Sequence, residues 1–256
     1  MYEIVDTHCH LDMEQFDSER DEVIHRSKDG GVKAIIIPST TKEDYEKERM
    51  LCDKNDILYY MVGIHPHEAK SANGESYDLA VNHIKNDRCV GIGEIGLDYY
   101  YNNSPRNIQR DVFANFLDIA IENRVPVSIH CRDADDDIID ILLSRKDVSG
   151  VIHCFSGSEK LLKAGLELGL YFGIGGILTF KNSILKDTIK EVPLEFIVFE
   201  TDAPYLAPIP KRGKRNEPLY IAYVIEKMSE ILGKDPQLIS KIGLENAKHV
   251  FSLDKI

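Results

Sequence analysis

Eight short apolar runs recur along the chain, and a stretch with helical periodicity follows each of them. The runs are continuous and rich in β-branched residues, which is typical of parallel strands that are covered on both faces. Successive runs begin about 28 residues apart, which is the size of a βα unit. The predicted strands span residues 3–7, 32–38, 57–62, 89–93, 126–129, 150–152, 170–174 and 196–200.

Start signals mark several of the intervening helices. Thr41 with Asp44 resembles a capping box. Ser104 before Pro105 predicts a cap that is followed by a proline at the first helical position. Both signals place helices between consecutive strands, as a repeating βα unit requires.

The number of units indicates the fold. Residues 218–232 and 236–251 predict two closing helices after the last apolar run. No linker, low-complexity tract or repeat interrupts the pattern, so residues 1–256 are predicted to form one domain. Eight βα steps predict an α/β fold, a single-domain (β/α)8 TIM barrel. A doubly wound open sheet is the alternative, although eight units would make that sheet large.

Composition and charge limit the partners of such a domain. The 43% hydrophobic content suffices for a full core, and the net charge of −12 disfavours extended nonspecific binding of duplex nucleic acid. The five cysteines include no C-x-x-C pair, which favours reduced thiols in a cytoplasmic protein. We find no signal peptide and no membrane-spanning run. We therefore expect no membrane association and no stable protein partner.

Side chains of the types that bind metals follow five of the eight predicted strands. They are His8, His10, Glu94, His130, His153 and Asp202. In a (β/α)8 barrel, functional groups lie at the carboxyl ends of the strands, so we expect these six to form one cluster. His8 and His10 are two residues apart, so their side chains point to the same side of extended backbone.

Imidazole and carboxylate groups together suit divalent ions, and two ions about 3.5–4 Å apart can activate water and stabilise the leaving oxygen of a phosphodiester. We expect two divalent metal ions (Mg, Mn or Zn), with Glu94 bridging them and Asp202 orienting or deprotonating the attacking water. A single histidine at a strand end is more often hydrogen-bonded than metal-bound. Asp202 alone is equally explained as a turn cap, and Glu94 as a partner of Arg132. The combination of six ligand-type residues favours the metal site.

Other residues near the predicted strand ends are candidates for binding substrate. His65 is interpreted as a phosphate contact or a proton donor to the leaving group, and otherwise as a turn histidine. Arg132 is interpreted as a phosphate clamp or as an orienting group. Tyr99, Tyr100 and Tyr205 are candidates for base stacking, although aromatic residues at such places also pack under loops.

A basic run in this acidic chain follows the last predicted strand, beside the region where barrels often bind phosphate. Lys211, Arg212 and Lys214 are therefore expected to contact substrate phosphates, although most such runs are only solvated surface. Arg215 and Asn216 have the alternative role of holding this loop in place. Cys9, Cys131 and Cys154 adjoin the ligand histidines and are expected to be small buried hydrophobes rather than ligands.

Seven sequence blocks carry a resemblance to a known family. They are Asp6-Thr-His-Cys-His-Leu-Asp12, Gly63-Ile-His-Pro-His67, Gly93-Glu-Ile-Gly-Leu-Asp98, His130-Cys-Arg-Asp-Ala134, His153-Cys-Phe-Ser-Gly157, Glu200-Thr-Asp-Ala-Pro-Tyr205 and Arg212-Gly-Lys-Arg-Asn-Glu-Pro218. With these blocks in this order, nearly the whole chain resembles the TatD family of metal-dependent deoxyribonucleases, within the amidohydrolase-like barrels. The resemblance implies hydrolysis of nucleic-acid phosphodiesters, usually as a 3′–5′ exonuclease on single-stranded or end-on DNA. It assigns the metal-binding residues to the same six positions.

Two other functions use similar residues. A metal-dependent amidohydrolase or esterase, for example one acting on aminoacyl-tRNA, would employ the same activation of water. A non-catalytic barrel that only binds a partner would not need a complete ligand set. Because all six ligand-type residues are present, the non-catalytic barrel is the least favoured of the three functions.

Overall fold

The structure is a computed structural model that describes residues 1–253. Its eight strands coincide with the eight predicted runs and follow one another through the sheet in chain order, and the registered pairs are parallel. They are β1 (Ile4–Asp6), β2 (Val32–Pro38), β3 (Leu58–Val62), β4 (Cys89–Asp98), β5 (Val127–Arg132), β6 (Gly150–Ile152), β7 (Tyr171–Ile174) and β8 (Ile197–Phe199). This order and direction are those of a (β/α)8 barrel.

Helices alternate with the strands. The α-helices are α1 (Arg20–Asp29), α2 (Asp44–Asp53), α3 (Gly74–His83), α4 (Arg106–Asn123), α5 (Asp135–Leu143), α6 (Glu159–Glu167), α7 (Leu185–Thr188), α8 (Ile221–Leu232) and α9 (Pro236–Val250). Short 3₁₀ helices are η1 (Glu14–Phe16), η2 (Pro66–Ser71), η3 (Gly176–Thr179), η4 (Leu194–Phe196) and η5 (Pro218–Tyr220). Within residues 1–253, no helix has the length and apolar character needed to cross a membrane.

The chain divides into two compact units. Unit 1 comprises Met1–Ile37, Cys154–Glu159 and the chain from Tyr171 onward, and unit 2 comprises Pro38–His153 and Lys160–Leu170. Each unit holds its own set of paired strands and covering helices. The expectation of a single domain over residues 1–256 stays a prediction.

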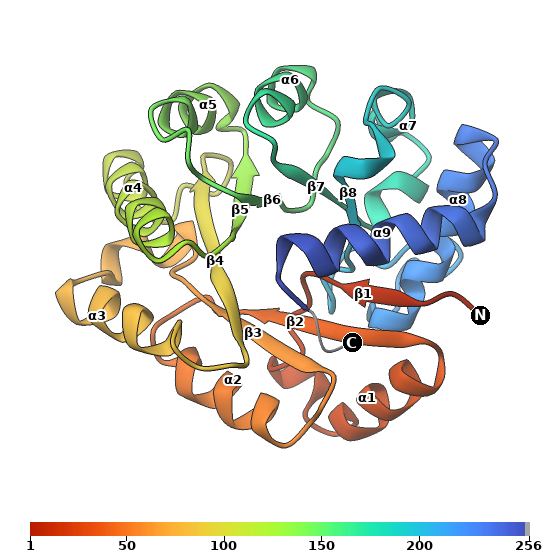
Figure 1. Cartoon of the computed structure of the whole chain (residues 1–256), viewed down its shortest axis with the longest axis horizontal. Helices are drawn as coiled ribbons and strands as arrows, with labels where there is room; N and C mark the ends of the chain where they lie inside the picture. The colour runs from red at the N-terminus through yellow and green to blue at the C-terminus, as the bar shows by residue number, and fades with distance from the viewer. Residues whose placement is uncertain (254–256) are drawn as a thin grey trace. The chain divides into compact units, whose positions relative to one another are not determined.

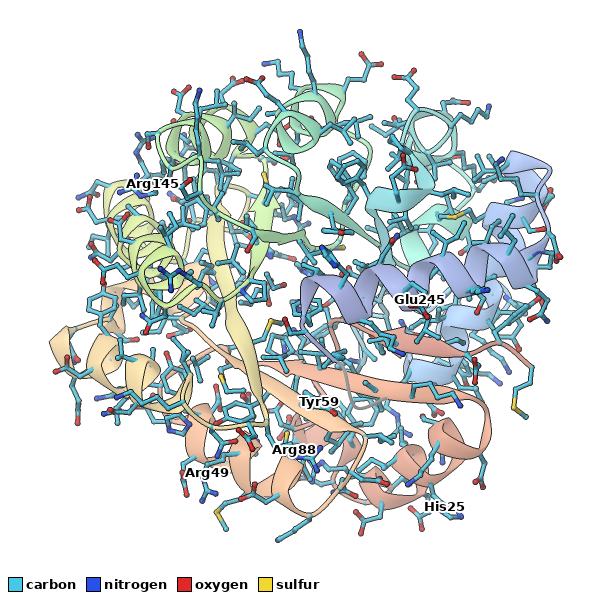
Figure 2. The ribbon with its side chains drawn as sticks, in the orientation of Figure 1. His25, Arg49, Tyr59, Arg88, Arg145 and Glu245 are labelled. Atoms are coloured by element: carbon cyan, nitrogen blue, oxygen red, sulfur yellow. The ribbon has the colours of Figure 1, made fainter. Side chains whose placement is uncertain are left out.

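In unit 2, strands β3 to β6 pair in order, and each helix lies against its own strand. Helix α2 contacts β3, α4 contacts β4 and α5 contacts β5, as Figure 1 shows for the orange to green segments. The apolar side chains of β3 are all buried, which explains why its run is continuous rather than alternating. At the start of β4, the guanidinium of Arg88 lies 5.3 Å from the ring centroid of Tyr59, and Figure 2 labels both residues.

Two strands of unit 2 are longer than the apolar runs that predict them. Strand β4 continues to Asp98 and β5 to Arg132, and the two strands remain paired between Gly96–His130 and Asp98–Arg132. Polar ligand-type residues end an apolar run without ending the strand, because the backbone ladder does not depend on side-chain polarity. His130 pairs with Gly96 in the ladder. Glu94 lies at a break in the register between β4 and β5, and its N–H donates to the carbonyl of Ser39 at 3.0 Å.

The two start signals for helices differ in outcome. Asp44 accepts hydrogen bonds from the backbone N–H and the hydroxyl of Thr41, so this pairing is confirmed at the start of α2. The Ser104–Pro105 prediction is wrong in its detail. Pro105 is itself the N-cap of α4, and no side chain caps this end. The Ser104 hydroxyl instead donates to the carbonyl of His67, so a tertiary contact replaces the cap.

In unit 1, β1 pairs with β2 and β7 pairs with β8. Helix α9, drawn in dark blue in Figure 1, contacts both β1 and β8. Its approach depends on Gly243, where an added Cβ would lie 2.6 Å from ring carbons of Phe199. Helix α8 packs on α9, so the two predicted closing helices cover the strands of this unit.

Candidate metal centre

In unit 2, three imidazoles converge on one carboxylate oxygen. Glu94 Oε1 lies 2.7 Å from His130 Nδ1, 3.2 Å from His153 Nε2 and 3.5 Å from His65 Nε2. The side chain of Glu94 is 3% exposed, so water does not compensate for this crowding. The structure thus brings together three residues predicted as ligands, together with His65. We call these four residues the Glu94 cluster.

Asp98 supports this cluster, and the sequence analysis did not select it. Asp98 Oδ2 lies 3.2 Å from His130 Nε2 and 3.0 Å from His67 Nε2, and Oδ1 accepts the backbone N–H of Tyr101 at 2.9 Å. A signal was available, because Asp98 is four residues after Glu94 and an even spacing places both side chains on one face of a strand. A carboxylate behind a ligand histidine fixes the ring orientation and the proton position.

The contacts of His130 and His65 indicate the roles of their ring nitrogens. His130 Nε2 faces the Asp98 carboxylate at 3.2 Å, and His130 Nδ1 faces Glu94 Oε1 at 2.7 Å. A ring that carries both protons satisfies both contacts, whereas a ring with its single proton on Nε2 leaves the Nδ1 lone pair for a metal ion. Two acceptors 2.7 Å apart require a proton or a cation between them. In His65, Nδ1 accepts the backbone N–H of His67 at 3.2 Å, so a neutral His65 carries its proton on Nε2. His65 is therefore a hydrogen-bond donor toward the cluster and is less suited to bind metal.

Burial and charge shift the protonation of these groups in different directions. Burial lowers the pKa of His65 to about 4, so its ring is neutral near pH 7. Burial also acts to lower the pKa of His130, but its hydrogen bonds to Asp98 and Glu94 outweigh this and raise it. For Asp98, burial is likewise outweighed, and the bond from His130 leads the contacts that hold its pKa far below the usual range. Asp98 is thus a permanent anion behind His130.

Unit 1 holds a second group of ligand types. Asp202 Oδ1 lies 4.0 Å from His8 Nε2 and 3.6 Å from His10 Nε2, and the two imidazole centroids are 5.1 Å apart. One donor atom from each residue lies within 4.8 Å of the others. The prediction that His8 and His10 point to the same side is confirmed. We call these three residues the Asp202 cluster.

The backbone around Asp202 is held in an unusual conformation. Asp202 has φ of 55°, in the left-handed region that a non-glycine residue seldom occupies. Its N–H donates to the carbonyl of His8 at 2.9 Å. Next to it, Thr201 donates both its N–H and its hydroxyl to the buried carboxylate of Asp6. Such backbone strain persists where surrounding contacts enforce it, and it aims the Asp202 carboxylate at the two histidines.

Both clusters have the donor chemistry that divalent ions require. Each combines neutral imidazole nitrogens with a carboxylate, the set that suits Zn, Mn and similar ions. The Asp202 cluster offers His8, His10 and Asp202, and the Glu94 cluster offers Glu94, His130 and His153. The residues therefore fit metal ions.

The predicted substrate contacts of unit 1 lie on the loop after β8. The Arg212 guanidinium carbon is 4.2 Å from the ring centroid of Phe180, and Lys211 Nζ lies over the ring of Tyr220 at 5.2 Å. Lys214 is exposed. Tyr205 is 48% exposed, and its ring centroid lies 6.5 Å from that of His10. Of these predicted contacts, Tyr205 is therefore placed beside a ligand-type residue.

Arg215 and Asn216 hold the loop, which was one of the two roles considered for them. Arg215 donates to the carbonyl of Gln15 at 2.6 Å and to Glu19 at 3.0 Å. Asn216 is fully buried and donates to the carbonyl of Thr201 at 2.8 Å. These contacts connect the basic loop to the backbone beside Asp202.

The cysteines divide into two groups. Cys9 is fully buried, as expected, and burial raises its pKa well above the ordinary value. Cys131 and Cys154 are only partly buried, so the expectation of buried hydrophobes is wrong for them. Cys131 donates from Sγ to Asp135 at 3.3 Å, and the left-handed backbone of Cys154, with φ of 49°, lets its N–H donate to Glu200. Cys131 thus lies near the end of β5 and Cys154 just after β6, where both make polar contacts.

Comparison with known proteins identifies the family. The model of the family described as TatD related DNase matches residues 5–252. The chain belongs to the TatD family. A Bacillus subtilis (strain 168) relative named "Uncharacterized metal-dependent hydrolase YabD" is 36% identical over 254 residues, covering 98% of this chain and 100% of the relative. A Pectobacterium parmentieri relative named "3'-5' ssDNA/RNA exonuclease TatD" is 35% identical, covering 97% and 99%.

The TatD-family fold is also found among solved structures. The crystal structure of YJJV, a TatD homologue from Escherichia coli K12, matches with a TM-score of 0.92 and 28% identity, covering 97% of this chain and 98% of that one. The predictions of a (β/α)8 barrel and of a hydrolase are confirmed. The number and identity of the metals, and the roles of the individual residues, stay predictions.

Proposed function

We propose that this TatD-family protein is a divalent-metal-dependent phosphodiesterase that removes nucleotides from the 3′ end of single-stranded DNA. The observation that carries the proposal is the convergence of His130, His153 and His65 on the buried Glu94 oxygen. The Glu94 carboxylate and the imidazoles of His130 and His153 are groups that bind divalent cations, and His65 donates toward the same oxygen from Nε2. The exonuclease names of relatives from Pectobacterium and Rahnella support the choice of substrate.

The proposal uses the ligand-type residues that follow the strands, because functional groups of a (β/α)8 barrel lie at the carboxyl ends of its strands. His8, His10 and Asp202 would hold metal in unit 1, and Glu94, His130 and His153 would hold metal in unit 2. Bound divalent ions would lower the pKa of water and neutralise charge on the phosphate oxygens. Asp98 would then keep the His130 ring in the tautomer that leaves the Nδ1 lone pair for a metal ion.

The chemical step exchanges one bond at phosphorus. The oxygen of a water molecule bonds to the phosphorus of the last phosphodiester, and Asp202 accepts one proton of that water at Oδ1. The bond from phosphorus to the 3′ oxygen of the preceding nucleotide breaks, and that oxygen takes up a proton from solvent water to become the 3′ hydroxyl. Asp202 returns its proton to solvent, and a nucleoside 5′-phosphate is released. His65 is neutral with its proton on Nε2, so it donates a hydrogen bond to a phosphate or leaving oxygen.

A labelled oligonucleotide tests this function directly. A single-stranded DNA carrying a 5′ fluorophore is incubated with the metal-supplemented protein, and the products are resolved by length. We expect a ladder that shortens one nucleotide at a time from the 3′ end. A parallel assay with an aminoacyl ester of tRNA examines the esterase alternative. Hydrolysis of the ester without any shortening of DNA would contradict the proposal.

A further inference from the structure

Two exposed tyrosines and an arginine form a compact patch at the carboxyl ends of β4 and β5. Tyr100 and Tyr101 are 60% and 56% exposed, and their ring centroids lie 4.9 Å apart at 87°. The guanidinium carbon of Arg132 lies 4.2 Å from the Tyr100 centroid and 4.8 Å from that of Tyr101. We call these three residues the Tyr–Arg patch. Exposed aromatic rings of this size contribute little to the core, so the fold does not explain them.

The Tyr–Arg patch is joined to the Glu94 cluster through one residue. Asp98 accepts the backbone N–H of Tyr101 at Oδ1 and faces His130 at Oδ2. The Tyr101 ring also lies 5.4 Å from that of His67, which bonds the same carboxylate at 3.0 Å. A group held on the patch is therefore placed next to the Glu94 cluster.

Neighbouring side chains engage Tyr99, the residue that precedes the two exposed tyrosines. Its hydroxyl donates to Asp137 at 2.5 Å, and Arg106 lies over its ring at 4.2 Å. Arg110 also pairs with Asp137 at 2.5 Å. Tyr99 is therefore already occupied by protein contacts, whereas Tyr100 and Tyr101 present their rings to solvent.

The charges of the patch are suited to a nucleotide. Arg110 is compensated by Asp137, whereas Arg132 and Arg106 form no ion pair within residues 1–253. A guanidinium donates readily to phosphate, and a tyrosine ring stacks on any base. The patch thus offers local cations and aromatic rings in a chain whose net charge of −12 would otherwise repel nucleic acid.

We propose that the Tyr–Arg patch binds one nucleotide of the single-stranded substrate beside the scissile phosphodiester, with its base on Tyr100 or Tyr101 and its phosphate on Arg132. This inference rests on the proposed function and specifies its substrate. A base can stack there only when it is not paired, so the patch selects single strands. The Tyr–Arg patch discriminates between a nucleotide with a base and one without, but not between different bases, because every base has an aromatic face.

The test compares natural oligonucleotides with oligonucleotides that contain one abasic site. A tetrahydrofuran residue is placed in turn at each of the last three positions of a single-stranded DNA, and kcat/KM is measured for each substrate. In the parent, the abasic site at one position should reduce kcat/KM roughly 5- to 100-fold, the range expected for loss of one base–aromatic stack. In a Tyr100→Ala/Tyr101→Ala variant, natural and abasic substrates should be hydrolysed at nearly equal rates.

Three further variants separate stacking from other effects. Tyr100→Phe/Tyr101→Phe keeps the rings and should keep the discrimination. Arg132→Ala should raise KM for every oligonucleotide and reduce its salt dependence. Arg88→Ala is the matched control, because Arg88 also lies over a tyrosine ring but at the start of β4 (Figure 2). It should behave as the parent.

A base-free substrate distinguishes failure of this inference from failure of the proposed function. A strand made only of tetrahydrofuran residues contains phosphodiesters but no aromatic ring, so the Tyr100→Ala/Tyr101→Ala variant should hydrolyse it as well as the parent. If the parent cleaves oligonucleotides but its discrimination survives in the double alanine variant, the inference is overturned. If the parent cleaves no phosphodiester, the proposed function fails. In that case, fluorescence anisotropy measures the equilibrium binding of the natural and abasic strands. The ratio of their affinities, compared between the parent and the double alanine variant, then decides the inference.

Discussion

Asp98→Asn should weaken metal binding although Asp98 is not a predicted metal ligand. Asp98 is 1% exposed and faces the Nε2 atoms of His130 and His67 through one oxygen. An amide in its place still accepts the N–H of Tyr101 through its oxygen. Its NH₂ group then points at two ring nitrogens that carry protons, so the ring of His130 loses its orientation.

The size of the effect follows from the hydrogen bonds that the substitution removes. Outer carboxylates behind ligand histidines typically account for about 10–100-fold in metal affinity, or about 1.4–2.7 kcal/mol. The variant also loses hydrogen bonds from two imidazoles to a buried anion, each worth about 1.5–3 kcal/mol. Part of that loss is offset because Asn is less costly to bury than a carboxylate. We therefore expect Tm to fall by roughly 4–8 °C.

Isothermal titration calorimetry with Mn²⁺ measures the metal affinity, and thermal melts of the metal-free protein measure the stability. The control is Asp137→Asn, because Asp137 also accepts from a tyrosine and an arginine but lies away from the ligands. Its Mn²⁺ affinity should equal that of the parent. If Asp98→Asn lowers Tm but leaves the Mn²⁺ affinity within twofold of the parent, Asp98 only stabilises the fold and does not position His130.

Three other outcomes are expected. Excess EDTA should abolish hydrolysis and Mg²⁺ or Mn²⁺ should restore it, whereas full activity of protein shown by elemental analysis to lack metal would contradict the mechanism. Asp202→Asn should leave the melting curve near that of the parent but reduce kcat by about 10²–10⁴, and a kcat within a few-fold of the parent would remove Asp202 from its assigned role. Replacing Lys211, Arg212 and Lys214 together by Ala should raise KM more than it lowers kcat and should flatten the salt dependence of KM. Identical KM and salt slope in parent and variant would show that this run is only solvated surface. Arg215 is left unchanged because it holds the loop to Gln15 and Glu19.

Much of the candidate site is visible in the sequence because strand ends carry functional groups in this fold. Each apolar run marks a strand, and the polar residue that follows it marks a possible ligand. The expectation was a single cluster of six ligand-type residues. Within unit 2 the structure brings Glu94, His130 and His153 together, and within unit 1 it brings His8 to Asp202. Residue type and position sufficed for these ligands because each acts through its own side chain. The direction of that side chain follows from the place of the residue on its strand.

The roles that depend on a second residue could not be read from the sequence. The proton on His65 Nε2 follows from a backbone N–H that reaches its other nitrogen, and the position of His130 follows from Asp98 on the neighbouring strand. Tyr99 and Tyr100 were equal candidates for base stacking in the sequence, yet the structure bonds the hydroxyl of Tyr99 to Asp137 and leaves Tyr100 exposed. A sequence pattern records the period of the backbone and the type of each side chain. Which hydrogen-bond partner lies across from a side chain is decided only when separate strands and helices pack together.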